Sequence, residues 1–208
     1  MGKLMLRVCF AVLCLQVVAF AQTTRTIVFL GDSLSAGFGV KPNESFPSLV
    51  ADKIHAAGLP YEVENAGLSG DTTAGGLRRV DWLLQKKIDV LVIELGGNDG
   101  LRGLPVSAVK SNIQAIIDKA KAKNPDIKIV LAGMQIPPNV GADYAAQFQR
   151  VYGELAAANN ATLIPFLLEG VGGIRDLNQP DMIHPNAAGH RIVADVVWRT
   201  LEPILRQP

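Results

Sequence analysis

One short segment near the start of the chain combines residue types from which a nucleophilic site can be built. Gly31-Asp32-Ser33-Leu34-Ser35 directly follows a run of apolar residues. A serine on a sharp strand-to-helix turn can expose its hydroxyl above the edge of a sheet, and its backbone N–H can help to hold an oxyanion. Serine is also a common helix N-cap. Taken alone, the segment favours capping by Ser33 over catalysis.

A serine hydroxyl needs a neighbouring base to become a good nucleophile, and the chain offers three histidines. His55 is expected on a helix surface or at a helix end, and His190 is expected to have a structural or solvent role where the last predicted helix opens. His184 differs because Asp181 lies three residues before it. A tight turn can place that carboxylate beside the imidazole, where it would fix the tautomer and stabilise the imidazolium. A plain surface turn with an Asp–His contact is the alternative.

Two glycine-containing segments could supply hydrogen-bond donors to the same site. Gly67–Thr72 follows the second predicted strand, and Gly96–Asp99 follows the third. Because glycine lets the backbone approach a ligand closely, the Gly70 N–H could donate to a developing oxyanion. The Asn98 side-chain amide is a second possible donor. Each segment alone is more typical of an ordinary glycine turn.

Together these segments resemble, in order and position, the four sequence blocks of the SGNH hydrolases, also called GDSL lipases and esterases. The resemblance implies Ser33 as nucleophile, His184 as base and Asp181 as the residue that orients the base. It implies an oxyanion hole formed by the Ser33 and Gly70 N–H groups and the Asn98 amide. It also implies hydrolysis of esters, thioesters and lysophospholipids, with no metal ion and no cofactor.

Two other classes of function remain possible from the residues alone. The loops also contain four aspartates that a divalent cation could gather into a phosphohydrolase site, namely Asp32, Asp71, Asp99 and Asp181. A non-catalytic ligand-binding domain is the second alternative. The chain contains neither a Gly-x-x-x-x-Gly-Lys-Ser/Thr phosphate loop nor a Gly-x-Gly-x-x-Gly fingerprint, which disfavours nucleotide binding.

Several apolar residues in these loops could form the wall of an acyl channel, or could simply anchor the loops by packing. They are Leu68, Leu101, Leu104, Ile136, Pro137 and Pro138.

The elements that must position these residues follow from hydrophobic periodicity. Short apolar runs predict five strands, and longer segments with helical periodicity lie between them. Strands that alternate with helices indicate right-handed crossovers and a parallel sheet. We therefore predict an α/β fold, a flavodoxin-like three-layer α/β/α sandwich with a five-stranded parallel sheet, in which ligands bind beyond the carboxyl ends of the strands. The predicted strands are 26–30, 61–64, 89–94, 127–131 and 162–164, and the predicted helices fall within 46–57, 77–84, 109–120, 148–155 and 192–204.

The first 21 residues resemble a cleavable export signal rather than part of the domain. Lys3 and Arg7 precede the apolar stretch Val8–Phe20, and Ala19-Phe20-Ala21 offers small residues where a signal peptidase acts. A membrane anchor is the alternative, although the stretch is short for a bilayer. Cleavage after Ala21 would leave one domain over residues 22–208, in the periplasm or secreted.

The expected mature chain contains no cysteine, because Cys9 and Cys14 leave with the signal. Its 18 basic side chains nearly balance its 19 acidic ones, after subtraction of Lys3 and Arg7 from the 20 basic residues of the full chain. This balance gives no reason to expect a nucleic-acid partner. We expect a small-molecule or lipid ester substrate, no stable membrane anchor and a monomer.

Overall fold

The computed structural model describes residues 24–137 and 140–207, which contain a single five-stranded sheet. All its strands pair in parallel, in the order β2-β1-β3-β4-β5, which is the flavodoxin-like order. The predicted fold class is therefore confirmed. The strands are β1 (Arg25–Gly31), β2 (Tyr61–Gly67), β3 (Val90–Glu94), β4 (Lys128–Ala132) and β5 (Thr162–Ile164).

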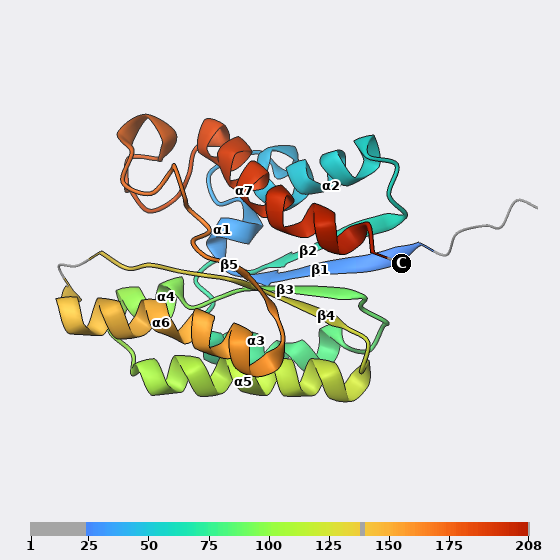
Figure 1. The fold of residues 1–208 in the computed structure, drawn as a ribbon. Coiled ribbons are helices and arrows are strands. Elements are labelled where there is room, and N and C mark those ends of the chain that lie inside the picture. Colours follow the sequence, from blue (N-terminus) through green and yellow to red (C-terminus); the bar gives the residue numbers. More distant parts are fainter. Residues whose placement is uncertain (1–23, 138–139, 208) are drawn as a thin grey trace, which may run out of the picture.

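Helices cover both faces of the sheet (Figure 1). Helices α1, α2 and α7 lie on one face, and α3, α5 and α6 lie on the other. The helices are α1 (Ser33–Ala36), α2 (Phe46–Ala56), α3 (Thr73–Leu83), α4 (Gly97–Leu101), α5 (Val106–Lys123), α6 (Ala142–Asn159) and α7 (Ala187–Leu205), with 3₁₀ turns η1 (Pro42–Glu44) and η3 (Arg175–Leu177).

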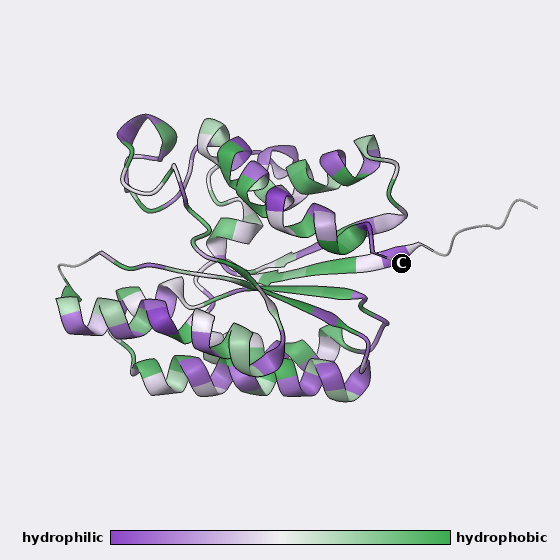
Figure 2. Cartoon of the chain, viewed as in Figure 1, coloured by the Kyte–Doolittle hydropathy of each residue, from purple (hydrophilic) through white to green (hydrophobic). Residues whose placement is uncertain are grey.

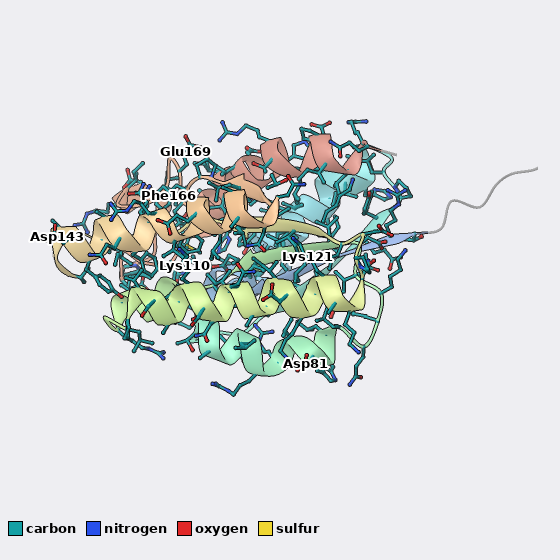
Figure 3. The ribbon with its side chains drawn as sticks, turned by 60° about the horizontal axis from the view of Figure 1, so that its bottom comes forward. Asp81, Lys110, Lys121, Asp143, Phe166 and Glu169 are labelled. Carbon is teal, nitrogen blue, oxygen red and sulfur yellow. The ribbon has the colours of Figure 1, made fainter. Side chains whose placement is uncertain are left out.

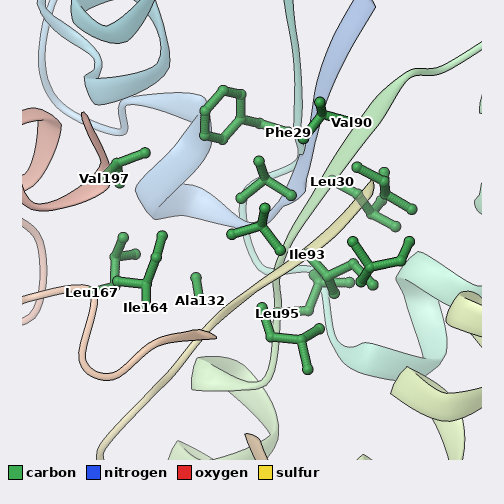
Figure 4. Packing of buried hydrophobic residues seen from close by; sticks show 14 of the residues in the cluster. Phe29, Leu30, Val90, Ile93, Leu95, Ala132, Ile164, Leu167 and Val197 are labelled. Atoms are coloured by element: carbon green, nitrogen blue, oxygen red, sulfur yellow. The ribbon is translucent and has the colours of Figure 1, made fainter. Parts of the chain in front are cut away.

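The core is built from residues that the strands bury on both faces. Figure 2 shows hydrophobic strands between helices whose outer faces are hydrophilic. Ile27, Val28, Phe29 and Leu30 of β1 are all fully buried, as expected for a central parallel strand. Figure 4 shows how such side chains from the strands pack with Val197 of α7.

Charged side chains occupy the outer surface of the helices, and Figure 3 labels four of them: Asp81 of α3, Lys110 and Lys121 of α5, and Asp143 of α6. Lys110 of α5 pairs with Glu154 of α6, and Lys119 of α5 pairs with Asp81 of α3. Exposed pairs of this kind contribute little to stability. Within the described residues, no helix is long and apolar enough to cross a membrane. The proposed signal segment 1–21 lies outside the described residues.

The structure corrects the expectation of an ordinary glycine turn at Gly96–Asp99, because the short helix α4 begins there. Gly96, Gly97 and Gly100 make this segment a poor helix by propensity. Tertiary contacts require the glycines instead: a Cβ on Gly96 would collide with the Tyr152 hydroxyl, and one on Gly100 would collide with Ile136. Close packing on α6 and the loop after β4 therefore overrides the local preference.

The register of the sheet brings the ends of three strands to the same level. Gly31, the last residue of β1, pairs with Gly67 of β2 on one side and with Glu94 of β3 on the other. The segments that follow these strands carry Ser33, Gly70 and Asn98. This register places all three at the carboxyl edge of the sheet.

Candidate active site

Ser33, His184 and Asp181 form one hydrogen-bonded chain. The Ser33 Oγ lies 2.8 Å from His184 Nε2, and His184 Nδ1 lies 2.7 Å from Asp181 Oδ2. In the tautomer with its proton on Nδ1, His184 donates to the Asp181 carboxylate, and its Nε2 is then able to accept the Ser33 hydroxyl proton. Ser33 is 8% exposed, which leaves its hydroxyl accessible from one side only.

A tight turn holds Asp181 beside His184. The second carboxylate oxygen, Oδ1, accepts the backbone N–H groups of Ile183 and His184 at 2.9 and 3.0 Å. The turn requires a positive φ of 60° at Met182, a conformation that is uncommon for a residue with a side chain. Although partial burial raises the pKa of Asp181, the hydrogen bonds from His184 and Ile183 outweigh burial and lower that pKa to about 2.

The turn that carries Ser33 is capped by Asp32, the residue before it. Asp32 Oδ1 accepts the Leu34 N–H at 3.0 Å, so the N-cap of α1 is Asp32. This corrects the expectation that Ser33, taken alone, would be the cap. Burial raises the pKa of Asp32 to about 6, although the bonds from Leu34 and Asn98 act against it.

Glu94 lies directly beneath this turn and was not among the site residues predicted from the sequence. It is fully buried, and its Oε2 accepts hydrogen bonds from Asp32 and Ser35. Burial, followed by the nearby Asp32 carboxylate, raises the pKa of Glu94 well above its usual range. The signal in the sequence was an acidic residue at the end of an otherwise apolar strand, Val-Leu-Val-Ile-Glu.

The three expected oxyanion donors lie at this edge and differ in whether another hydrogen bond already occupies them. No hydrogen bond among the described residues occupies the backbone N–H groups of Ser33 or Gly70. Gly70 has a φ of +81°, which favours glycine at this position. The Asn98 amide already donates to Asp32 Oδ2 at 3.0 Å and to the Asp71 carbonyl at 2.9 Å. Its donation to an oxyanion therefore requires exchange of one of these bonds.

Arg79 fastens the Gly70 loop to the sheet and was also missed from the sequence. Its guanidinium donates to Asp71 Oδ2, to the Ala66 carbonyl and to the Gly31 carbonyl, at 2.7–2.9 Å. Nothing in the local sequence pattern marks Arg79, because its three partners come from the ends of two strands and the loop between β2 and α3.

The four loop aspartates have separate partners. Asp99 accepts the backbone N–H and hydroxyl of Thr73, at 2.9 and 2.6 Å, which joins α4 to the start of α3. Asp71 pairs with Arg79, Asp181 with His184, and Asp32 with its own turn. Among residues 24–137 and 140–207, no three acidic, histidine or cysteine side chains gather as a possible metal site.

The other two histidines lie apart from this chain of hydrogen bonds. His55 is exposed on α2, as expected. His190 is 1% exposed and its Nδ1 accepts the Phe46 N–H at 3.2 Å, which is the structural role expected for it. Burial lowers the pKa of His190 to about 4.

An apolar cavity of about 390 Å³ lies beside the site. Of the residues expected to form an acyl channel, Leu101, Ile136 and Pro137 line it. Leu68 and Leu104 are not part of its lining, and Pro138 lies outside the described residues. The sequence did not indicate Phe166, Leu168 or Met182, which also line the cavity, because the long segment after β5 has no regular pattern.

Known proteins resemble this chain over most of its length. The chain is 42% identical to Esterase TesA of Pseudomonas aeruginosa, with 99% of this chain and all of that protein covered. It is 35% identical to Thioesterase 1/protease 1/lysophospholipase L1 of Escherichia coli K12, with 89% of this chain and 87% of that protein covered.

Solved structures show the same fold. The crystal structure of TesA matches with a TM-score of 0.83 at 42% identity, over 86% of this chain and 99% of that one. The psychrotrophic esterase EstA from Pseudoalteromonas sp., inhibited by monoethylphosphonate, matches with a TM-score of 0.82 at 35% identity, over 88% of this chain and all of that one. The sequence profile of the GDSL-like lipase/acylhydrolase family matches residues 29–192. The chain therefore belongs to the GDSL-like lipase/acylhydrolase family.

Proposed function

We propose that the protein cleaves carboxylic esters and thioesters through a Ser33–His184–Asp181 triad and an acyl-enzyme intermediate. The observation that carries this proposal is the pair of short contacts, 2.8 Å from Ser33 Oγ to His184 Nε2 and 2.7 Å from His184 Nδ1 to Asp181 Oδ2. They are the contacts that a serine, its base and an orienting carboxylate require.

The reaction begins when His184 Nε2 takes the Ser33 proton and Oγ attacks the carbonyl carbon. The carbonyl π bond opens to a tetrahedral oxyanion, which collapses and breaks the ester C–O or thioester C–S bond. His184 gives its proton to the leaving alcohol or thiol. Water, deprotonated by His184, then attacks the acyl-serine and releases the acid, with the proton returned to Ser33.

The oxyanion is held by the backbone N–H groups of Ser33 and Gly70, with the Asn98 amide as a third donor. The two N–H groups support this role because neither has another partner among the described residues. The Asn98 amide is fixed close by through Asp32 and Asp71. The two backbone donors are preorganised and stabilise the transition state without reorganising during the reaction, whereas the Asn98 amide exchanges one of its two present bonds for the oxyanion.

The substrate is an ester or thioester with an apolar acyl group. The cavity beside the site has an apolar lining. Seven large hydrophobic side chains are exposed among the described residues, and all except Trp82 lie on segments that follow the carboxyl ends of the strands. These six side chains would contact an amphiphilic substrate, in keeping with the lysophospholipase named among the relatives. They are Phe38, Leu68, Leu101, Val140, Ile174 and Ile183.

Labelling with a fluorophosphonate tests the nucleophile. We expect a single covalent adduct on Ser33, located by peptide mass mapping, and ester hydrolysis that EDTA does not change. The control is Ser111→Ala, which removes an exposed hydroxyl on α5 and should leave labelling intact. EDTA-sensitive phosphatase activity without labelling would instead support a metal-dependent enzyme. If neither labelling nor phosphatase activity is found, a non-catalytic binding domain is supported.

We also propose that the protein is exported and keeps no stable membrane anchor. The basis is the charged and apolar pattern of residues 1–21. Fractionation of expressing cells, followed by N-terminal sequencing, should recover a periplasmic or secreted chain that begins at Gln22. A chain that keeps its N-terminus in the membrane fraction would contradict the proposal.

A further inference from the structure

Glu94 is the buried acidic residue beneath the proposed nucleophile. It is the last residue of β3, and its chain neighbours Ile93 and Leu95 belong to the packed core (Figure 4). Its Oε2 accepts the Asp32 N–H at 3.2 Å, the Ser35 N–H at 3.1 Å and the Ser35 hydroxyl at 2.6 Å. One oxygen atom therefore fixes the backbone on both sides of Ser33.

The backbone N–H groups of residues 32–35 show the consequence. Those of Asp32 and Ser35 donate to Glu94, and that of Leu34 donates to the Asp32 carboxylate. Two buried carboxyl groups thus occupy three of the four donors. The fourth, on Ser33, is the one that no other described residue occupies. The turn leaves free the donor that an oxyanion at Ser33 would need.

The glycine that begins this turn is explained by the same contact. A Cβ on Gly31 would collide with the Ser35 hydroxyl and with Glu94 Oε2. Glycine at this position therefore allows the carboxyl group of β3 to reach the turn after β1. The close approach links Glu94 to the Gly31–Ser35 segment, from which it is 59–63 residues distant in sequence.

A purely structural role explains the position of Glu94 less well. Its other oxygen, Oε1, is buried without a hydrogen-bond partner among the described residues. A buried polar atom without a partner costs free energy, so the side chain is not optimal for the core. What it contributes is the geometry of the turn.

We propose that Glu94 is a positioning residue for the proposed reaction, a role that rests on the function proposed above. It acts as a hydrogen-bond acceptor that holds the Ser33 N–H toward the oxyanion and Ser33 Oγ toward His184. A side chain of the same size that keeps an acceptor oxygen should therefore replace it. A side chain of the same size without one should not.

The test compares Glu94→Gln, which keeps the acceptor, with Glu94→Met, which removes it at similar volume. Val92→Ala is the matched control, because Val92 lies two residues earlier in β3, is equally buried, and has an apolar side chain that makes no hydrogen bond to the turn. For each variant we would measure the melting temperature, kcat and KM with a p-nitrophenyl ester, and the rate of fluorophosphonate labelling at Ser33.

We expect kcat of Glu94→Gln to stay within about threefold of the wild type and that of Glu94→Met to fall about 10²-fold, the loss that a displacement of about 1 Å can cause. KM should change little, because the oxyanion interaction forms mainly in the transition state. Labelling at Ser33 should slow in parallel. Val92→Ala should lose melting temperature and keep kcat.

Three outcomes would overturn the proposal: a folded Glu94→Met variant with wild-type kcat, equal losses in the Gln and Met variants, or an equal loss of kcat in Val92→Ala. If Glu94→Met does not fold, Glu94→Asp takes its place, since it withdraws the carboxylate by one methylene group. Its kcat should fall about tenfold, and an unchanged kcat would overturn the proposal.

Absence of Ser33 labelling in the wild-type protein would overturn the proposed function itself. Equal labelling rates of the wild-type and Glu94→Met proteins would overturn only the role of Glu94.

Discussion

The carboxyl and amino edges of the sheet differ in how deeply their polar side chains are buried. Ten polar or charged side chains are buried among the described residues, and all ten end a strand at the carboxyl edge or lie in the segments and first helical turns beyond it. At the amino edge, polar side chains such as Arg25 and Lys128 make hydrogen bonds while they remain partly exposed. Burial of polar groups costs free energy unless they are paired. The fold therefore concentrates this cost where the proposed chemistry takes place.

Cavities at the two edges are of similar size and differ in the residues that line them. A cavity of about 310 Å³ at the amino edge is lined by Arg25, Lys87, Asp89, Asp126 and Lys128, among others. The cavity of about 390 Å³ at the carboxyl edge is mainly apolar and lies beside the Ser33 turn, with Leu34 in its lining. An apolar pocket with a few convergent polar groups suits a small-molecule substrate, and only the second cavity has this composition.

The largest effect should come from His184→Ala. Without a base, the Ser33 hydroxyl remains a weak nucleophile, so kcat should fall about 10⁵–10⁶-fold, as when a triad member is removed. The control is His55→Ala, which removes an exposed histidine on α2 and should leave kcat unchanged. Steady-state hydrolysis of a p-nitrophenyl ester measures both. A His184→Ala enzyme within tenfold of the wild type would remove His184 from the mechanism.

Asn98→Ala should have the next largest effect. Loss of one side-chain donor from an oxyanion hole lowers turnover about 10²–10³-fold, and the two N–H donors should remain. The melting temperature should be measured as well, because the amide also joins Asp32 to the Asp71 carbonyl. Wild-type kcat in a well-folded variant would show that Asn98 keeps its ground-state bonds throughout the reaction.

The pH dependence of stability should reveal His190. Its pKa of about 4 in the folded protein is below the ordinary value of 6.5, so the unfolded chain binds the proton more readily. Protonation of His190 in the unfolded chain should therefore lower the free energy of unfolding by about 2 kcal/mol as the pH falls from 7 to 4.5. Asp32, whose pKa is raised to about 6, acts in the opposite direction over this range.

His190→Asn separates the contribution of His190 from that of Asp32. The amide oxygen of the new side chain can accept the Phe46 N–H, and it does not titrate. Urea unfolding of both proteins at several pH values gives the difference. If the two proteins lose the same stability between pH 7 and 4.5, His190 is not the group responsible.

Arg79→Met should lower kcat about tenfold, because it removes the bond to Asp71 that ties the Gly70 loop to the ends of β1 and β2, so that the Gly70 N–H is less well placed. Arg78→Met is the matched control, since Arg78 is an exposed neighbour on α3. Kinetics with the same ester would show the difference. Equal kcat in the two variants would mean that the loop holds its shape without Arg79.

The smallest effect should follow a change at the amino edge. Lys87 pairs with Asp89 at 3.0 Å, but the Lys87 side chain is 75% exposed. Lys87→Ala should change the free energy of unfolding by no more than about 0.5 kcal/mol and leave kcat as it is. A marked loss of activity would show that the amino edge also contributes to function.

The same contrast explains what the sequence could predict. Strands such as β1 and β3 were predictable because burial on both faces makes them continuous apolar runs. The end of β2 was not, since Glu64 and Asn65 interrupt the apolar pattern while pairing with β1 continues to Gly67. Ser33, Gly70, Asn98, Asp181 and His184 could be proposed as site residues because their four segments, taken together and in order, resemble the sequence blocks of one family, although each segment alone favoured a cap or a turn.

Glu94 and Arg79 could not be located, because their importance comes from partners distant in sequence. Glu94 contacts the turn after β1, and Arg79 contacts the ends of β1 and β2. The wall of the cavity was predicted only in part for the same reason: Phe166 and Met182 come from the irregular segment after β5. Local patterns in combination indicate candidate reacting groups, and tertiary contacts decide what supports them.

The acyl-enzyme itself offers the most direct test of the central claim. A p-nitrophenyl ester is mixed with the enzyme, quenched in acid during the first turnover, and the protein is analysed by intact mass and peptide mapping. We predict a mass increase equal to one acyl group, located on Ser33 and absent from Ser33→Ala. An acyl group on another residue, or a Ser33→Ala enzyme that hydrolyses the ester at the wild-type rate, would contradict it.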